Sequence, residues 1–464
     1  MNYFVLVNKD NKIKDKYYKN LKLVEVLNVL DKKTKVEEKT YNAYLELKKF
    51  LEEKDIIIGI DTAYRDEDIQ QETWNYFLEE KGEEYCHKYV APVGYSEHHT
   101  GLAIDISLKK DGKFLIDNGD LFKYDDEFKK IHPYLKKFGF ILRYPLGKEN
   151  ITGYNYEPWH IRYVGTVAAN IIYENNLTLE EYLTKFGGVL VVNKEKGITS
   201  FDVVKEVSKT LGIKKIGHTG TLDPLAEGVL VLTIGTFTKL GEDLTSLDKE
   251  YIAEVEEGII TDTLDITGNI IDKNNNRVSE LENLITSFKK TYLQEVPAYS
   301  AVKVNGKKLY EYARSGIDVE LPKKEVTIKE IELLSKDKDK FTFKTVVSKG
   351  TYIRSLIRDM GDISNTLMTM TRLIRTRQGK FRIEDSYTLE DIKNNNFKIL
   401  GIDDLFDYPV IDIDDSLFKK IDNGVRIENT FNIEDKVMFR YNGEIICIYK
   451  SDDDYLKMYK KLRW

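Results

Sequence analysis

The chain has 464 residues, of which 41% are hydrophobic and 32% charged, a composition that predicts about three globular domains with sizeable cores. Its formal net charge of −7 excludes nucleic-acid binding through overall charge, so any RNA site must be a local basic patch. Two distant cysteines, Cys86 and Cys447, exclude a disulfide framework and favour a reducing compartment.

The first third of the chain is predicted to alternate helices with short strands. Residues 1–10 hold an apolar run without a basic segment before it, too short for a signal peptide or a membrane span, so we expect a cytoplasmic protein with no membrane partner. Apolar spacing predicts helices over 40–53, 67–81 and 126–138, the last two ended by Gly82 and Gly139. A buried strand is predicted over 55–60, and a weakly alternating strand over 102–108.

A domain boundary is expected at the glycine pair Gly187-Gly188. Thr178 to Glu181 forms a capping-box pattern that opens a last short helix, and a strand over 189–193 follows the glycines without a Pro- or Ser-rich linker. We therefore place one domain over 1–185, a second over 187–400 and a small β-rich one over 401–464.

Beyond the boundary, strands and helices mix without a regular β-α alternation, which predicts an α+β fold with a mixed sheet. Helices are expected over 200–211 and 354–363, and strands over 251–258 and 340–348. In the tail, strands over 436–441 and 444–449 flank Asn442-Gly443, a strong hairpin signal.

The first domain carries residues suited to a catalytic zinc ion. Such a site needs about three imidazole or carboxylate ligands and an open position. His98 and Asp105 can supply two from a turn and the following strand, and His160 can supply the third. Glu157 could act as general base for the attacking water, and Arg65 could stabilise the oxyanion.

The segments that contain these residues, in this order, resemble the motifs of the VanY-like D-alanyl-D-alanine carboxypeptidases. Arg143 to Lys148 and Thr152 to Tyr154 also resemble family segments. The resemblance covers about residues 1–184 and implies Zn²⁺ on His98, Asp105 and His160. It also implies Glu157 as general base, Arg65 as transition-state stabiliser, Ser96 and Gln70 as substrate contacts, and a peptide ending in D-Ala as substrate.

Three other histidines need separate readings. His99 competes with His98 as a ligand, but neighbouring side chains in extended chain point opposite ways, so only one should face the metal. The family pattern selects His98. His87 and His132 are interpreted as structural or exposed.

Two alternatives stay open for this domain. Wall-directed peptidases of this type act outside the membrane, yet no export signal is visible at the start of this sequence. Either the substrate is a cytoplasmic peptide ending in D-Ala, or the domain has another role. It could be a non-catalytic binding or scaffold domain, or the chain could be an uncoupled gene fusion.

The second domain is marked by Gly217 to Gly228, a glycine-rich loop that holds Asp223 before Pro224. Alone, an Asp-Pro pair is usually a turn or a helix cap. The string nevertheless resembles the catalytic loop of TruB-type tRNA pseudouridine synthases. Further matches follow in family order: residues 193–200, 249–265, 297–314, 348–354 and 373–376.

This resemblance, which runs from about 187 to the C-terminus, implies isomerisation of uridine-55 in the TΨC loop of tRNA without metal or organic cofactor. Asp223 would be the nucleophile, with Arg354 paired to it. Tyr251 would stack on the flipped-out base, and Leu373 would line the pocket.

Further RNA contacts are expected around that loop. Tyr299, Tyr352 and Lys303 are candidate substrate contacts, as is a run over 349–380 with seven basic and two acidic residues. Glu195 and Phe201 stand where the family usually has Pro and His, which affects the RNA pocket and not the reaction. The tail resembles the PUA-like RNA-binding extension of these synthases, and no protein partner is predicted.

Overall fold

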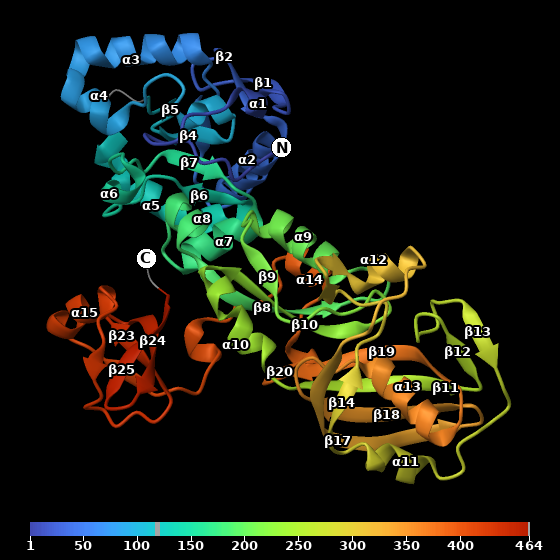
Figure 1. The fold of residues 1–464 in the computed structure, drawn as a ribbon. Coiled ribbons are helices and arrows are strands. Elements are labelled where there is room, and N and C mark those ends of the chain that lie inside the picture. The colour runs from blue at the N-terminus through green and yellow to red at the C-terminus, as the bar shows by residue number, and fades with distance from the viewer. Residues whose placement is uncertain (117–120, 463–464) are drawn as a thin grey trace. The chain divides into compact units, whose positions relative to one another are not determined.

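The structure, a computed structural model, describes residues 1–116 and 121–462 (Figure 1). The chain divides into two compact units: Met1–Phe186 with Lys209–Lys214 and Lys393–Asn395, and the remainder from Gly187 onwards. Helices and sheets occur together in each, which confirms the predicted α+β class. Within the described ranges, no helix has both the length and the hydropathy needed to cross a bilayer.

The first unit is built on an antiparallel sheet with strand order β3-β4-β7-β6, to which β5 adds at β4. The strands are β3 (Ile58–Thr62), β4 (Ala103–Lys110), β5 (Lys113–Phe114), β6 (Phe140–Leu142) and β7 (His160–Tyr163). Apolar side chains of α2 (Glu38–Glu52) and α5 (Asp125–Leu135) share its core with Ile104, Ile161 and Trp159. The strand predicted over 55–60 begins later, because Asp55 has φ +61° and the Ile56 amide closes α2 on Leu51.

The remaining elements of this unit surround the sheet. Gly82, with φ +83°, ends α3 as predicted, and the Thr178 capping box opens α8 as predicted. Their bounds are α1 (Asp15–Tyr18), β1 (Leu23–Leu27), β2 (Lys33–Glu37), α3 (Glu67–Lys81), α4 (Glu83–Tyr89), α6 (Glu149–Thr152), α7 (Thr166–Glu174) and α8 (Leu179–Thr184).

The second unit is organised by a mixed sheet of order β14-β17-β18-β11-β19-β10-β8. In the described part β10 and β19 run parallel and the other neighbours antiparallel. The strands are β8 (Gly187–Lys194), β10 (Glu227–Gly235), β11 (Lys249–Glu257), β14 (Thr291–Glu295), β17 (Lys323–Asp337), β18 (Lys340–Val347) and β19 (Met368–Gln378).

Shorter strands and helices complete this sheet. Strand β9 (Ile216–His218) pairs with β10, β20 (Phe381–Arg382) pairs with β19, and α13 (Ile353–Ser364) packs beside β19 (Figure 1). The other elements are α9 (Ser200–Leu211), α10 (Gly241–Thr245), β12 (Ile259–Thr261), β13 (Ile270–Lys273), α11 (Leu281–Ser287), β15 (Lys303–Val304), β16 (Lys307–Lys308), α12 (Leu309–Arg314) and α14 (Leu389–Lys393).

The tail forms a five-stranded sheet of order β21-β23-β24-β25-β22 around its own apolar cluster. Asn442 and Gly443, with φ +49° and +82°, make the predicted tight turn between β23 and β24. The bounds are β21 (Val410–Asp412), α15 (Asp415–Asp422), β22 (Ile427–Glu428), β23 (Lys436–Tyr441), β24 (Glu444–Asp452) and β25 (Tyr455–Lys461).

Candidate active sites

The loop that carries Asp223 connects β9 to β10 and is held on both sides. The Ser200 hydroxyl accepts from the Leu222 amide at 2.9 Å and donates to the Leu222 carbonyl at 3.1 Å. The Gly197 amide donates to the Pro224 carbonyl at 2.8 Å. Gly228 has φ +98°, and a Cβ there would lie 2.3 Å from the Arg375 carbonyl oxygen. Gly197 and Ser200, just before and at the start of α9, thus fix the backbone on either side of Asp223.

Arg354, on the first turn of α13, lies at the centre of this site. Its side chain is 5% exposed, and Nη2 lies 2.7 Å from Asp223 Oδ2. The same guanidinium donates to the Thr263 carbonyl at 2.9 Å and the Tyr299 carbonyl at 3.0 Å, with Asp265 Oδ2 at 3.8 Å. Because backbone groups hold the guanidinium, it can hold the Asp223 carboxylate in one orientation.

Asp223 lies in the wall of a cavity of about 350 Å³. Its carboxylate is 37% exposed, whereas Tyr251 and Leu373, which also line the cavity, are buried. Tyr299 and Tyr352, two of the predicted substrate contacts, also line it. The volume lies within the usual range for small-molecule sites.

Lys303, on β15, is exposed and lies outside the residues that line this cavity. Lys249 lines it and was not singled out from the sequence. Burial lowers the pKa of Lys249 to about 8, and its ammonium donates to the Thr245 and Leu247 carbonyls. The motifs therefore indicated a lysine that lies outside the cavity, Lys303, and did not indicate Lys249, which lines it.

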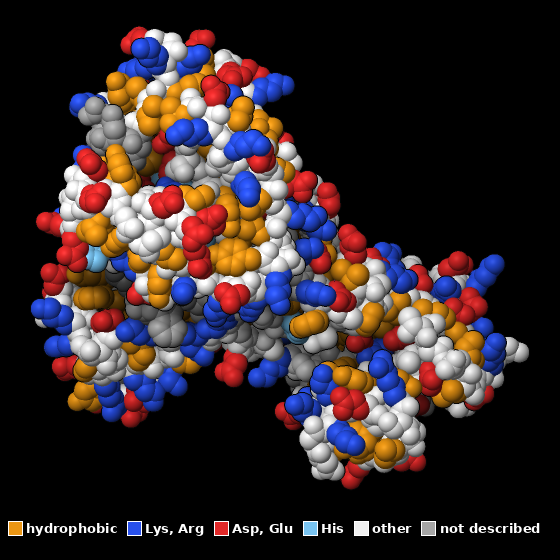
Figure 2. Space-filling model, turned by 90° about the horizontal axis from the view of Figure 1, so that it is seen from above, with side chains coloured by type: hydrophobic (Ala, Val, Ile, Leu, Met, Phe, Trp, Pro, Cys, Tyr) orange, Lys and Arg blue, Asp and Glu red, His pale blue; other side chains and the backbone are white. Residues whose placement is uncertain are grey.

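The basic run over 349–380 is divided between interior and surface. Arg375 is 1% exposed, lines the Asp223 cavity and donates to the Val229 and Gly220 carbonyls at 2.6 and 3.0 Å, so it supports the loop from the interior. Lys349, Arg372 and Lys380 remain exposed. On the face seen in Figure 2, basic side chains are interspersed with acidic ones, as expected for a chain of negative net charge.

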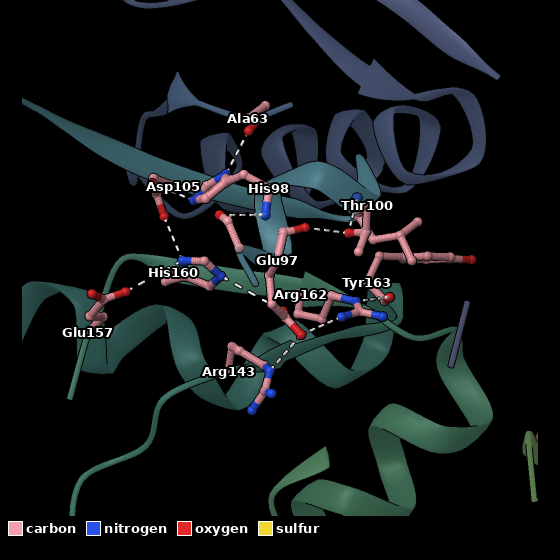
Figure 3. Close-up of polar contacts among 12 residues, drawn as sticks. Ala63, Glu97, His98, Thr100, Asp105, Arg143, Glu157, His160, Arg162 and Tyr163 are labelled. Carbon is pink, nitrogen blue, oxygen red and sulfur yellow. Dashed lines mark hydrogen bonds and ion pairs between the residues drawn. The ribbon is translucent and has the colours of Figure 1, made fainter. Parts of the chain in front are cut away.

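The first unit gathers His98, Asp105 and His160 into one buried cluster (Figure 3). Each offers a ligand atom, and these atoms lie within 4.8 Å of one another. His98 comes from a short 3-10 turn that ends at Gly101 with φ +70°. Asp105 and His160 are direct partners on the neighbouring strands β4 and β7.

The orientation of the imidazoles fits a cation. His98 Nδ1 donates to the Ala63 carbonyl at 2.6 Å, which leaves Nε2 free and 3.1 Å from Asp105 Oδ2. His160 Nδ1 lies 2.9 Å from Asp105 Oδ1, yet that buried oxygen makes no hydrogen bond with any described residue. Close approach without hydrogen-bond geometry is expected where donors converge on an ion, and two imidazoles with one carboxylate suit zinc.

The pKa shifts of His98 and Asp105 agree with this arrangement, whereas burial of His160 is outweighed by Asp105, which raises the pKa of His160 to about 9, so that a cation would have to displace that proton. Burial lowers the pKa of His98 to about 4, which keeps its imidazole neutral as a ligand must be. Burial alone would raise the pKa of Asp105, but the two histidines hold it well below its usual value. The Asp105 carboxylate therefore stays ionised and can bind a cation.

The other predicted residues surround the cluster. Glu157 Oε2 lies 3.5 Å from His160 Nδ1, and Arg65 Nη2 lies 3.4 Å from Asp105 Oδ2. Gln70 accepts from Arg65 and donates to the Ala91 carbonyl, so it orients the arginine, whereas Ser96 accepts from the His98 amide. These contacts keep a proton acceptor and a cation beside the ligands.

A cavity of about 60 Å³ lies against the cluster and is lined by its charged residues and by aromatic rings such as Tyr89 and Trp159. His99 stays apart from the metal-ligand set, since its Nδ1 donates to the Arg65 carbonyl and its Nε2 accepts from the Gly94 amide. His87 is exposed on α4 and His132 hydrogen-bonds the Pro158 carbonyl.

Residues 208–353 match the model of the TruB family pseudouridylate synthase, N-terminal domain. The tRNA pseudouridine synthase B of Caldanaerobacter subterraneus subsp. tengcongensis is 44% identical over 265 residues, which make up 56% of this chain and 93% of that protein. The chain belongs to the TruB family. Its Fusobacterium nucleatum relative, also a tRNA pseudouridine synthase B, is 50% identical over 200 residues, 42% of this chain and 69% of that protein.

This TruB-family chain also contains a second matched domain. Residues 33–166 match the model of the D-alanyl-D-alanine carboxypeptidase family VanY. A solved vancomycin-resistance D,D-pentapeptidase VanY in complex with Zn(II) is 30% identical and covers 39% of this chain and 99% of that one, with a TM-score of 0.34. Both predicted resemblances are confirmed: the chain is a pseudouridine synthase that carries a VanY-like domain.

One supporting residue of the TruB-family site, Gln378, was not found from the sequence. Gln378, buried on β19, donates to Thr219 and to the Leu244 carbonyl and so holds the chain beside the catalytic loop. Glu195 and Phe201, the two departures from the family pattern, are both exposed. They change the surface beside the loop and leave its internal hydrogen bonds intact.

Proposed function

We propose that Asp223 is the nucleophile with which this TruB-family chain converts uridine-55 in the TΨC loop of tRNA to pseudouridine. The observation that carries the proposal is the 2.7 Å pair between Asp223 and the buried Arg354, at the wall of a cavity that Tyr251 and Leu373 also line. A reactive carboxylate that is oriented yet accessible is what attack on a nucleotide requires.

The residues support the following sequence of events. A uridine leaves its stack and enters the cavity, where the Tyr251 ring contacts the base. Asp223 attacks the uridine or its ribose, and the bond between C1′ and N1 breaks. The base then turns and bonds to C1′ through C5 while the bond to Asp223 breaks and frees the carboxylate, and C5 loses a proton as N1 regains one. Arg354 keeps the carboxylate in place throughout.

Asp223→Asn tests this assignment. Incubation with unmodified tRNA, followed by mapping of pseudouridine, should show product for the wild type and none for the variant. Asp359→Asn is a matched control, because Asp359 pairs with Arg358 on α13 but lies outside the cavity. Product formation by Asp223→Asn at near wild-type rate would end the proposal.

For the first unit we propose a zinc-dependent carboxypeptidase that acts on peptides ending in D-Ala. His98 Nε2, Asp105 and His160 Nδ1 would hold the ion, which when bound supplies a Lewis acid for the scissile carbonyl. Glu157 would take the proton of the attacking water, and Arg65 would stabilise the charge on the carbonyl oxygen. The cavity of about 60 Å³ favours a small terminal residue.

Metal analysis and peptide hydrolysis test the second proposal together. The purified chain should contain about one zinc per molecule and release D-Ala from a peptide that ends in D-Ala-D-Ala. His98→Ala should lose both properties, whereas His87→Ala, which removes an exposed histidine on α4, should keep them. A wild-type chain that neither binds zinc nor cleaves the peptide would contradict it.

We also propose how the tRNA is held outside the cavity. Tyr299, Tyr352 and Lys303 would contact RNA near the catalytic loop, and residues 401–464 would form the PUA-like RNA-binding domain beside a catalytic domain over 187–400. The five-stranded sheet of the tail supports this division. Deletion of the tail should weaken tRNA binding more than it slows a single turnover at saturating enzyme.

A further inference from the structure

We propose that Glu97 is a positioning residue of the peptidase site: its carboxylate accepts the Nε2 proton of His160 and thereby turns Nδ1 of that ring toward the metal. The inference rests on the proposed zinc-dependent function of this unit. Glu97 immediately precedes the ligand His98, yet it acts on the other histidine of the set.

The two oxygens of Glu97 have different partners. Its side chain is fully buried, and Oε1 lies 2.8 Å from Arg143 Nε and 2.5 Å from Arg162 Nη1. Oε2 points the other way and lies 3.9 Å from His160 Nε2 (Figure 3). Because two arginines hold one oxygen, the direction in which the second oxygen points is fixed.

Glu97 Oε2 and His160 Nε2 face each other as buried atoms, and neither has a hydrogen-bond partner among the described residues. Buried polar atoms nearly always have a hydrogen-bond partner, so these two unpaired atoms indicate a hydrogen bond that a small movement of either side chain would form. The opposite ring atom, His160 Nδ1, lies among the carboxylate oxygens of Asp105 and Glu157.

The chemistry of a metal-bound imidazole gives this contact its role. A ring that binds a cation through Nδ1 carries its remaining proton on Nε2 and needs an acceptor there. A carboxylate acceptor fixes the ring orientation and raises the basicity of the ligand nitrogen. Glu97 can supply that acceptor only while Arg143 and Arg162 hold its other oxygen.

The competing hypothesis is that Glu97 is only a counterion that neutralises the two buried arginines. Glu97→Gln distinguishes this role from the positioning role without changing the shape of the side chain. An amide has a single acceptor oxygen, and the two arginines should hold it where they now hold Oε1, which leaves the amide nitrogen facing His160. A donor then opposes a donor, so the variant reverses the polarity of the contact.

Zinc affinity of the full chain, measured by competition with a chromophoric chelator, is the first readout. Glu97→Gln should bind zinc about 10- to 100-fold more weakly than the wild type, the usual loss when such a partner is removed. Glu180→Gln is the matched control: Glu180 accepts from both terminal nitrogens of Arg143, at 3.0 and 2.6 Å, and no described contact joins it to His160.

The control should keep zinc affinity within about threefold of the wild type. An equal loss in both variants would assign the effect to the arginine network, and unchanged affinity in a folded Glu97→Gln chain would remove the role altogether. Either result overturns the inference while leaving the proposed zinc function intact. A wild type without tight zinc would instead refute the peptidase proposal, and this inference with it.

A second readout needs no variant at position 97. The chain has only six histidines, so ring nitrogens labelled with ¹⁵N can be resolved by NMR in the full zinc-loaded protein, with His160 assigned by its loss in His160→Gln. We expect His160 to carry its proton on Nε2 and that proton to resonate downfield, as in a hydrogen bond to carboxylate. A proton on Nδ1, or zinc bound through Nε2, would overturn the inference.

Discussion

Ser200→Ala should slow pseudouridine formation although Ser200 never touches the substrate. The Ser200 hydroxyl accepts from the Leu222 amide and donates to the Leu222 carbonyl, one residue before Asp223, and both residues are buried. Loss of the hydroxyl leaves a buried amide without a partner, which costs about 1–3 kcal/mol. If that cost falls on the catalytic conformation of the loop, the population able to react drops about 5- to 150-fold.

A single-turnover assay reads this loss directly. tRNA carrying tritium on C5 of its uridines releases tritium to water when C5 bonds to the ribose, and the initial rate at saturating enzyme reports the chemical step. The control is Thr199→Ala, which removes the exposed Thr199–Asp202 cap of α9 and should cost about 1 kcal/mol of stability without slowing the reaction. A folded Ser200→Ala chain whose rate stays within about twofold of the wild type would refute the reasoning.

Three further predictions concern other parts of the molecule. Arg354→Lys keeps the charge but not the planar fork that reaches Asp223 and two carbonyls, so its single-turnover rate should fall by about 100-fold or more; a smaller loss would argue against an orienting role. Gly228→Ala places a Cβ 2.3 Å from a carbonyl at φ +98°, and denaturant unfolding should show a loss of about 1–3 kcal/mol. Zinc at about 100 times its dissociation constant should stabilise the peptidase unit by about 2.7 kcal/mol in thermal melts and leave the tritium-release rate unchanged, and the absence of a zinc-dependent melt would count against the metal site.

Elements with local signals were predicted well from the sequence. The helix over 67–81 has an acidic first turn and a glycine stop, and the tail hairpin has an Asn-Gly turn, so neighbouring residues alone determine both. The sheet order could not be predicted in this way. Parallel pairing of β10 with β19 joins Glu227 to Ile374, and nothing local to either strand encodes that contact.

The site residues were predicted through family motifs, whereas their supports were not. Arg375 was interpreted as part of a basic surface run. It lies two residues after Leu373 on β19, so both side chains are on the buried face of the strand, whereas Arg372 and Ile374 are on the other face. Strand periodicity could have placed it inside. Glu97 had no such signal, because the arginines that define its role, Arg143 and Arg162, come from distant segments of the chain.

The alternatives left open for the first unit differ in what they require of its interior. A scaffold without metal would leave buried Asp105 to be balanced by Arg65 and by a protonated His160. A zinc enzyme needs both imidazoles neutral, with the cation in place of that proton. The uncoupled-fusion hypothesis makes no such demand, because the described residues that line the two cavities lie over 65–160 and over 220–375 and neither cavity takes a residue from the other unit. Metal occupancy together with peptide hydrolysis therefore decides whether the first unit is an enzyme, and only rates measured on the joined and separated halves can decide whether it communicates with the second.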